Sequence, residues 1–251
     1  VGEQFKKVIL EKAPYLSRAL DKEAGKSYYE DQFGYLDGMV EETKMVNGEL
    51  LDGVHMTNHN VNPDWTVLCN IIMARYQVSR EKAEDILHEL GQSTTGIKRQ
   101  MMQSLIKSKN QRELEQVSFS FELPISLAVL THITRHRMHS LLVPDFVPLW
   151  NMENYVTPET VAENHEEEYR NIFAENALMV EWFKEQGVRD EDVIYFYLSG
   201  NACNIYTTMN ARTLEWISRM RCCNKAQWEI RALANEMVNQ ASRVAPLIGE
   251  G

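Results

Sequence analysis

The densest group of potential ligands in the sequence lies between residues 132 and 139. Three histidines, His132, His136 and His139, recur at intervals of four and three residues, and an arginine stands on either side of the second one. If the segment is helical, this spacing places the three imidazoles on one face. Three imidazoles on one face can bind zinc and leave a coordination position open. Zinc is therefore the first chemistry that the spacing suggests.

The two arginines, Arg135 and Arg137, favour an anion over a metal ion at the same place. Their fixed positive charge repels a divalent cation, and no carboxylate or thiol follows until Asp145. Two guanidinium groups with an imidazole between them instead offer several donors to phosphate oxygens. We therefore expect an anion site rather than a metal site. A solvated helix face stays open as an interpretation for such a tripeptide taken alone.

A second stretch, between residues 207 and 237, is rich in planar side chains with several hydrogen-bond donors. Its arginines could form surface ion pairs with nearby glutamates, which contribute little stability. Beside apolar residues, the same side chains also suit a ligand that combines phosphates with an aromatic heterocycle. The polar side chains concerned are Asn210, Arg212, Arg219, Arg221, Gln227 and Arg231.

The composition is that of a globular protein with an acidic surface. Hydrophobic residues make up 44% of the 251 residues, charged residues make up 25%, and the formal net charge is −10. Neutralising nucleic-acid phosphates needs a basic surface, so we expect no nucleic-acid partner. Any anionic ligand must then be held by a local cluster of arginines.

The spacing of the cysteines and the length of the apolar segments indicate in which cell compartment the protein resides. Cys69, Cys203, Cys222 and Cys223 show no CxxC spacing, and the vicinal pair is poorly placed for an ordinary bridge. We expect reduced thiols that are buried or partly buried. The sequence starts without an apolar signal core and has no apolar run of membrane-spanning length. The expectation is a cytoplasmic protein without a membrane partner.

Hydrophobic periodicity predicts a helix-rich α+β domain with few strands. Short strands are expected over residues 53–59, 116–124 and 204–210, and the second is expected to stop at Pro124. Ser79 is expected to cap the start of a helix. The predicted helices cover residues 3–25 with a break near Pro14, 64–76, 79–90, 94–110, 125–141, 157–187 and most of the last third of the chain.

Two motifs give the sequence a resemblance to the flavin-dependent thymidylate synthases. That family carries an RHR tripeptide at the end of a helix and, later, an NAR(S/T)L segment followed by an arginine and by AQWEI. Here these motifs are residues 135–137, residues 210–214, Arg221 and residues 226–230. The C-terminal motif is the more specific of the two.

The resemblance implies a fold and an arrangement of the chain. It implies a helix-rich α+β fold with a small, mainly antiparallel sheet over residues 53–248. Residues 1–52 look like a helical N-terminal extension, and the whole chain, residues 1–251, is expected to form one domain. Members of the family assemble as homotetramers with active sites between subunits.

The resemblance also implies a reaction, the reductive methylation of a uridine nucleotide (UMP or dUMP) at C5. The carbon donor is methylenetetrahydrofolate, the redox carrier is FAD and the reductant is NADPH. No cysteine nucleophile is needed, so the protein chiefly orients and polarises the reactants. Position by position, the implied FAD-binding residues are Glu115, Arg135, His136, Arg137, Asn210 and Arg212.

The implied nucleotide site centres on Arg221. It matches a family arginine that contacts the pyrimidine, where a positive charge would stabilise negative charge developing on the ring. Arg221 is therefore expected to be catalytic as well as substrate-binding. The other candidates for the substrate are His132, Ser140 and Asp145.

The nucleotide loop departs from the family pattern RHRxxSxNExSxRY. Ser140 is kept, but the positions of the family's Asn, Glu, Ser, Arg and Tyr all differ. Three hypotheses therefore compete: a C5-methylase of UMP or dUMP in nucleoside-antibiotic biosynthesis, an ordinary dUMP-specific thymidylate synthase, and a flavoprotein of different chemistry. The replacing residues are Leu142, Val143, Asp145, Val147 and Pro148.

Overall fold

The chain divides into two compact units, Val1–Asn47 and Gly48–Gly251. In the first unit the described part is helix α1 (Gly2–Lys12). The predicted break near Pro14 lies outside the described residues. The computed structural model describes residues 2–12, 49–94, 96–144 and 152–250.

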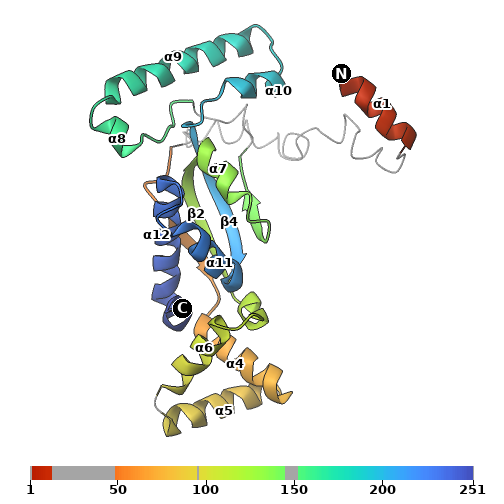
Figure 1. Ribbon diagram of the computed structural model, residues 1–251, viewed down its shortest axis with the longest axis vertical. Coiled ribbons are helices and arrows are strands. Elements are labelled where there is room, and N and C mark those ends of the chain that lie inside the picture. Colours follow the sequence, from red (N-terminus) through yellow and green to blue (C-terminus); the bar gives the residue numbers. More distant parts are fainter. Residues whose placement is uncertain (1, 13–48, 95, 145–151, 251) are drawn as a thin grey trace, which may run out of the picture. The chain divides into compact units, whose positions relative to one another are not determined.

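A small antiparallel sheet forms the centre of the second unit (Figure 1). Its four strands lie in the order β1-β2-β4-β3, and every neighbouring pair is antiparallel. The predicted fold class, helix-rich with a small antiparallel sheet, is confirmed. The strands are β1 (His55–His59), β2 (Ser118–Ser126), β3 (His139–Leu142) and β4 (Ala202–Asn210).

Strand β2 follows the alternation that its sequence predicts. Phe119, Phe121 and Leu123 are buried, and the residues between them are partly exposed. The strand does not stop at Pro124 as expected, because β4 pairs with it as far as Ser126. Pro124 lies beyond the last residue that pairs with β1, so its missing N–H falls where one edge of β2 is unpaired. Proline is tolerated at such an edge.

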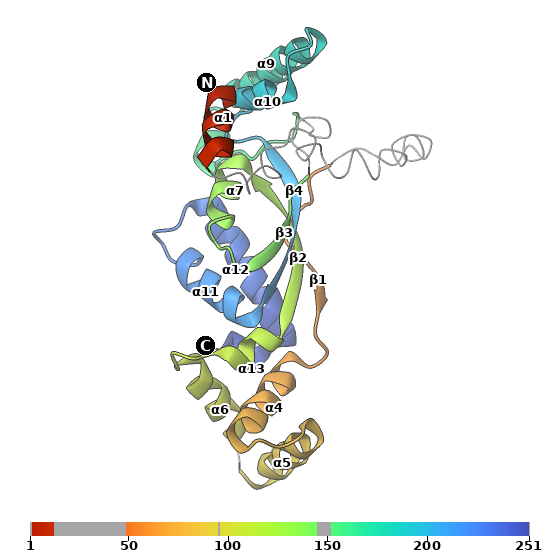
Figure 2. The ribbon, with the colours of Figure 1, turned by 90° about the vertical axis from the view of Figure 1, so that its right-hand side faces the viewer.

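Helices cover one face of the sheet (Figure 2). Ile217, Ile230 and Met237 from two of them join Phe119 and Ile205 of the sheet in one buried core. Each of these side chains is at most 2% exposed, so the layer is dry and holds the helices firmly on the strands. The helices are α7 (Leu127–Ile133), α11 (Ala211–Arg221), α12 (Trp228–Val244) and α13 (Pro246–Gly249).

Further helices pack at one end of the sheet, where Leu68, Leu87 and Met102 extend the same core. The predicted cap is confirmed: the Ser79 hydroxyl accepts a hydrogen bond of 3.2 Å from the backbone N–H of Lys82. These elements are α4 (Pro63–Tyr76), α5 (Arg80–Ser93), α6 (Ile97–Ile106) and the 3₁₀ helix η3 (Arg112–Gln116).

The single helix expected over residues 157–187 is wrong, because the chain forms α8 (Glu159–Ala162) and then α9 (Glu166–Glu185). The break places three consecutive glutamates, 166–168, in the first turn of α9. Negative charge at this end of a helix interacts favourably with the helix dipole and stabilises the helix. The expected end at Gly187 is confirmed, with φ 71°. After it come α10 (Asp190–Val193) and the 3₁₀ helix η4 (Ile194–Phe196).

Candidate functional site

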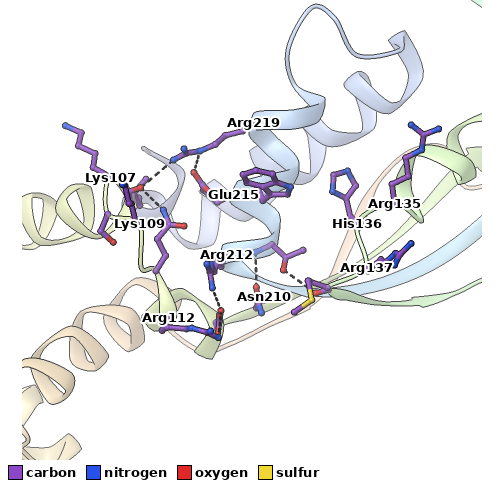
Figure 3. Close-up of a pocket in the computed structure, with 17 residues that line it drawn as sticks. Lys107, Lys109, Arg112, Arg135, His136, Arg137, Asn210, Arg212, Glu215 and Arg219 are labelled. Atoms are coloured by element: carbon purple, nitrogen blue, oxygen red, sulfur yellow. Dashed lines mark hydrogen bonds and ion pairs between the residues drawn. The ribbon is translucent and has the colours of Figure 1, made fainter.

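A cavity of about 950 Å³ opens beside the first turn of α11 (Figure 3). Three separate parts of the chain form its wall: the segment from the end of α6 through η3, the turn after α7, and the junction of β4 with α11. The fold brings all six residues that the family resemblance assigns to FAD into this one wall. They are Glu115, Arg135, His136, Arg137, Asn210 and Arg212.

The RHR tripeptide lies in a turn and not on a helix. Helix α7 ends at Ile133, whose carbonyl accepts a 3.0 Å hydrogen bond from the His136 N–H, and β3 begins at His139. The predicted helix over 125–141 is therefore wrong in its second half, and the three histidines share no helical face. The reason is tertiary, since His139–Leu142 pairs with β4. Strand pairing thus ends the helix and turns the tripeptide toward the cavity.

His139 serves the fold instead of a ligand. Its Nδ1 lies 2.7 Å from the Thr207 hydroxyl, and its Nε2 lies 3.3 Å from the Ile133 carbonyl oxygen. Both ring nitrogens are thereby engaged, one with β4 and one with the end of α7. The imidazole fastens the turn that carries the RHR tripeptide.

The start of α11 places the NAR residues. Asn210 is the last residue of β4 and caps α11, because its side-chain oxygen accepts a 2.8 Å hydrogen bond from the Thr213 N–H. The Thr213 hydroxyl in turn donates to the Met138 carbonyl at 3.2 Å. The second motif is thus hydrogen-bonded, at the cavity, to the residue that directly follows the RHR tripeptide.

Glu115 joins two arginines in the wall of the cavity. Arg112 donates to both of its carboxylate oxygens, at 2.9 and 3.2 Å, and Arg212 donates to one of them. These hydrogen bonds, from Arg112 first and then from Arg212, hold the pKa of Glu115 below its ordinary value. The carboxylate stays charged and fixes the direction of both guanidinium groups (Figure 3).

The cavity is strongly cationic although the whole chain is acidic. Seven lysines and arginines line it against two carboxylates, Glu115 and Glu215. Arg112 and Arg212 pair with Glu115, and Arg219 pairs with Glu215. The other four cations pair with no carboxylate among the described residues. In Figure 3 Arg135, His136 and Arg137 lie on the opposite side of the cavity from Lys107 and Lys109. The four unpaired cations are Lys107, Lys109, Arg135 and Arg137.

Two apolar side chains in the wall escaped the sequence analysis. Trp216 is 56% exposed and Met138 is 77% exposed, and both line the cavity. Trp216 lies one helical turn after Arg212 on α11, and that spacing was the signal available in the sequence. An exposed tryptophan beside cations offers a flat surface to an aromatic ring. Lys107, Lys109 and Arg112 were missed too, because nothing near them in the sequence indicates what they face.

Of the candidate substrate residues that the structure describes, His132, Ser140 and Arg221, none lines the cavity. Arg221 is behind the RHR turn, where its Nε donates to His136 Nε2 at 2.9 Å and its Nη2 donates to the His132 carbonyl at 3.1 Å. Ser140 is exposed on β3. Asp145 lies outside the described residues.

The environment keeps all three histidines from being protonated easily. Burial, followed by the charge of Arg221 and by His139, lowers the pKa of His136 to about 4. Burial, with the charges of Arg221 and Arg135, also lowers the pKa of His132, whose Nδ1 is buried without a hydrogen-bond partner. Burial lowers the pKa of His139 as well. The imidazoles are therefore neutral near pH 7, and the arginines supply the positive charge.

The described residues hold no group of three or more His, Cys, Asp or Glu side chains that could bind a metal ion. The four cysteines are free thiols. Cys69 and Cys203 are buried and Cys222 is partly buried, as expected, but the expectation is wrong for Cys223, which is exposed. Within the same described part of the chain, no helix is both long enough and apolar enough to span a membrane.

Comparison with curated proteins finds flavin-dependent thymidylate synthases. The one from Clostridium tetani is 33% identical over 162 residues, which cover 57% of this chain and 65% of the relative. The one from Geobacter sulfurreducens is 34% identical over 153 residues, which cover 55% and 62%. The chain spans between about half and two thirds of the length of the curated relatives that it matches.

The fold is also found in a solved structure, the crystal structure of a UMP/dUMP methylase PolB from Streptomyces cacaoi bound with 5-Br dUMP. The similarity has a TM-score of 0.64 at 15% identity and covers 81% of this chain and 94% of that one. The model of the family described as thymidylate synthase complementing protein (Thy1) matches residues 63–247. The chain therefore belongs to the Thy1 family, that of the flavin-dependent thymidylate synthases, as its two motifs predict.

Proposed function

We propose that the protein is an FAD-dependent C5-methylase of a uridine nucleotide, UMP or dUMP, with methylenetetrahydrofolate as carbon donor and NADPH as reductant. One observation carries the proposal: the six residues that the resemblance assigns to FAD meet in one cationic cavity, although they come from three separate segments. Membership of the family supports the same reaction.

The cavity suits a flavin dinucleotide in size and in chemistry. Its volume of about 950 Å³ lies at the upper end of the usual range for sites of small molecules and cofactors, about 300–1,000 Å³. FAD combines two flat ring systems with a pyrophosphate, so it needs both cations and aromatic surface. The wall offers four cations that pair with no carboxylate in the described part of the chain, and it offers Trp216 and Met138.

We assign the parts of the cofactor to the wall by their chemistry. Arg135 and Arg137, with the two lysines opposite, would hold the pyrophosphate through charge-assisted hydrogen bonds. Trp216 would stack on one ring system. Glu115 would act indirectly, by holding Arg212 in a fixed direction toward the ligand.

The protein's own contribution to the reaction is to bind, orient and polarise. When bound, FAD carries the reducing equivalents of NADPH to the one-carbon unit that becomes the methyl group. No free thiol lies in the cavity wall among the described residues, so the proposed route uses no cysteine nucleophile. Rate enhancement then rests on the relative placement of nucleotide, folate and cofactor.

The choice of UMP or dUMP is the finer part of the proposal. The structure with the same fold is described as a UMP/dUMP methylase, and the loop after the RHR tripeptide lacks the family's residues for dUMP. These two points favour a broad or altered nucleotide preference over a dUMP-specific thymidylate synthase. His132, Ser140, Asp145 and Arg221 remain the proposed substrate residues.

The proposal extends to assembly and setting. We propose a homotetramer with active sites between subunits, a helical extension over residues 1–52 on a core of residues 53–248, a cytoplasmic location and a role in nucleoside-antibiotic biosynthesis. The family resemblance supports the assembly, and the free thiols agree with a reducing compartment. Light scattering on the purified chain measures the assembly directly.

The deciding experiment offers UMP and dUMP separately to the purified chain with FAD, NADPH and methylenetetrahydrofolate. The expected result is a nucleotide product that is heavier by one methylene unit, and that requires all three additions. Omitting the folate is the matched control, since NADPH oxidation without it measures only leakage of electrons. If flavin binds but neither nucleotide gains mass, the protein is a flavoprotein of different chemistry; if flavin does not bind, the whole proposal fails.

A further inference from the structure

Arg221 and His136 form a direct hydrogen bond at the back of the cavity. The Arg221 Nε donates to His136 Nε2 at 2.9 Å, and the same guanidinium group donates from Nη2 to the His132 carbonyl at 3.1 Å. Two anchors, His136 in the turn and His132 near the end of α7, fix the direction of the guanidinium group. The residue that the family resemblance assigns to the pyrimidine is thus engaged with the RHR turn.

This hydrogen bond determines where the proton of His136 lies. A guanidinium group has only donors and is not deprotonated in proteins. His136 Nε2 must therefore be the acceptor, and the single proton of the neutral ring must lie on Nδ1. His136 lines the cavity, and its Nδ1 has no partner among the described residues. The N–H group at Nδ1 of His136 can therefore donate a hydrogen bond to a ligand in the cavity.

The surrounding charges agree with a neutral ring. Arg221 of α11, His139 of β3 and the flanking Arg135 and Arg137 surround His136, and all of them are cationic or neutral. Burial acts in the same direction and lowers the pKa of His136 to about 4. No carboxylate contacts the imidazole in the described part of the chain, so the neutral form persists near pH 7.

We propose that Arg221 is a positioning residue that holds His136 as the neutral Nδ1–H tautomer, so that His136 donates one hydrogen bond to a carbonyl oxygen or unprotonated ring nitrogen of the heterocycle in the cavity. A neutral single donor matches a neutral acceptor, whereas the four unpaired cations of the wall match phosphate. The identity of the heterocycle rests on the proposed function, but the tautomer does not.

The first test reads the tautomer directly. Nitrogen-15 spectra of the histidine side chains in the full chain at pH 7 distinguish a protonated Nδ1 from a protonated Nε2. We expect His136 as Nδ1–H in the wild type and a shift toward Nε2–H in Arg221→Met. Arg170→Met, an exposed arginine of α9, is the matched control and should leave the signal unchanged. A wild-type Nε2–H form or an imidazolium overturns the proposal.

The second test measures the affinities for FAD, UMP and dUMP, to find whether the Nδ1–H group of His136 donates a hydrogen bond to one of them. The side-chain amide of Asn reaches the position of Nδ1, and that of Gln reaches the position of Nε2. We expect His136→Asn to keep near-wild-type affinity for one of these ligands and His136→Gln to weaken it about 2- to 10-fold, the loss of one neutral hydrogen bond. Equal losses in both variants overturn the role in binding. Correct tautomers with no flavin binding at all would instead refute the proposed function.

Discussion

Glu229 of α12 holds Ser126 at the junction of β2 and α7. Its two carboxylate oxygens accept from the Ser126 N–H at 2.8 Å and from the Ser126 hydroxyl at 2.7 Å, and both residues are buried. The same hydroxyl accepts a 3.2 Å hydrogen bond from the Val129 N–H and so caps α7. The glutamate of the AQWEI segment therefore fixes the start of the helix that leads to the RHR turn.

We expect Glu229→Ala to destabilise the protein by about 2–4 kcal/mol, because it leaves two buried donors of Ser126 without an acceptor. Glu229→Gln keeps one acceptor oxygen and should cost less. Urea unfolding at pH 7 measures both. Glu167→Ala, an exposed residue in the first turn of α9, is the control and should change stability by about 0.5 kcal/mol or less. Equal stability of Glu229→Ala and the control would refute this role.

Trp216 is expected to report on the flavin. Stacking on a flat ring should quench its fluorescence when FAD is added, and Trp216→Ala should abolish most of that quenching and weaken binding by about 1–3 kcal/mol. Trp216→Phe keeps an aromatic surface and should bind more tightly than the alanine variant. Trp182→Phe on α9 removes another exposed tryptophan and serves as the control. Undiminished quenching in Trp216→Ala contradicts the assignment.

Arg137 is expected to bind the cofactor through its charge. Arg137→Ala removes one charged donor from the cavity and should weaken FAD binding by about 1.5–3 kcal/mol. A flavin titration at low and at high ionic strength measures this loss of affinity. Salt screens exposed charges, so the difference in FAD affinity between Arg137→Ala and the wild type should be smaller at high ionic strength. Arg170→Ala leaves the cavity untouched. An unchanged affinity in Arg137→Ala would show that another group holds the phosphates.

Stability is expected to fall as the pH drops from about 6.5 to about 4. The pKa of His136 is lowered from 6.5 to about 4 in the folded protein, so over this range the unfolded chain binds more protons. His132 and His139, whose pKa values are also lowered, add in the same direction. The lowered pKa of Glu115 has the same sign, but it acts below about 4.5.

The matched measurement is the free energy of unfolding of the wild type and of His136→Asn across this pH range. The variant lacks the titrating ring, so its stability should depend less steeply on pH between 6.5 and 4. Identical slopes would show that His136 does not titrate with a depressed pKa.

Much of the local structure could be predicted from the sequence, because its causes are local. The alternation of Phe119 and Phe121 with serines predicted a strand with one buried face. The hydroxyl of Ser79 and the positive φ of Gly187 set helix ends within a few residues. The motif residues that the resemblance assigns to FAD line one cavity.

The predictions that were wrong, and the cavity residues that were missed, depend on contacts between distant parts of the chain. The chain from His139 leaves the helical periodicity because β4, some seventy residues later, pairs with it. Pro124 stays in its strand because β1 ends two residues before it. Lys107 and Lys109 lie between α6 and η3, and Arg112 begins η3; all three line the cavity because η3 packs beside α11.

The sequence by itself determined the family, the alternation of its strands, several helix ends and the set of cationic side chains that a ligand would need. Short-range sterics, side-chain capping and the residue types themselves carry that information. Only the tertiary structure decided that the RHR tripeptide forms a turn, that Glu115 lies between Arg112 and Arg212, and that Arg221 binds His136 behind the cavity. These contacts join residues up to 97 positions apart, and they depend on how the sheet and its helices pack.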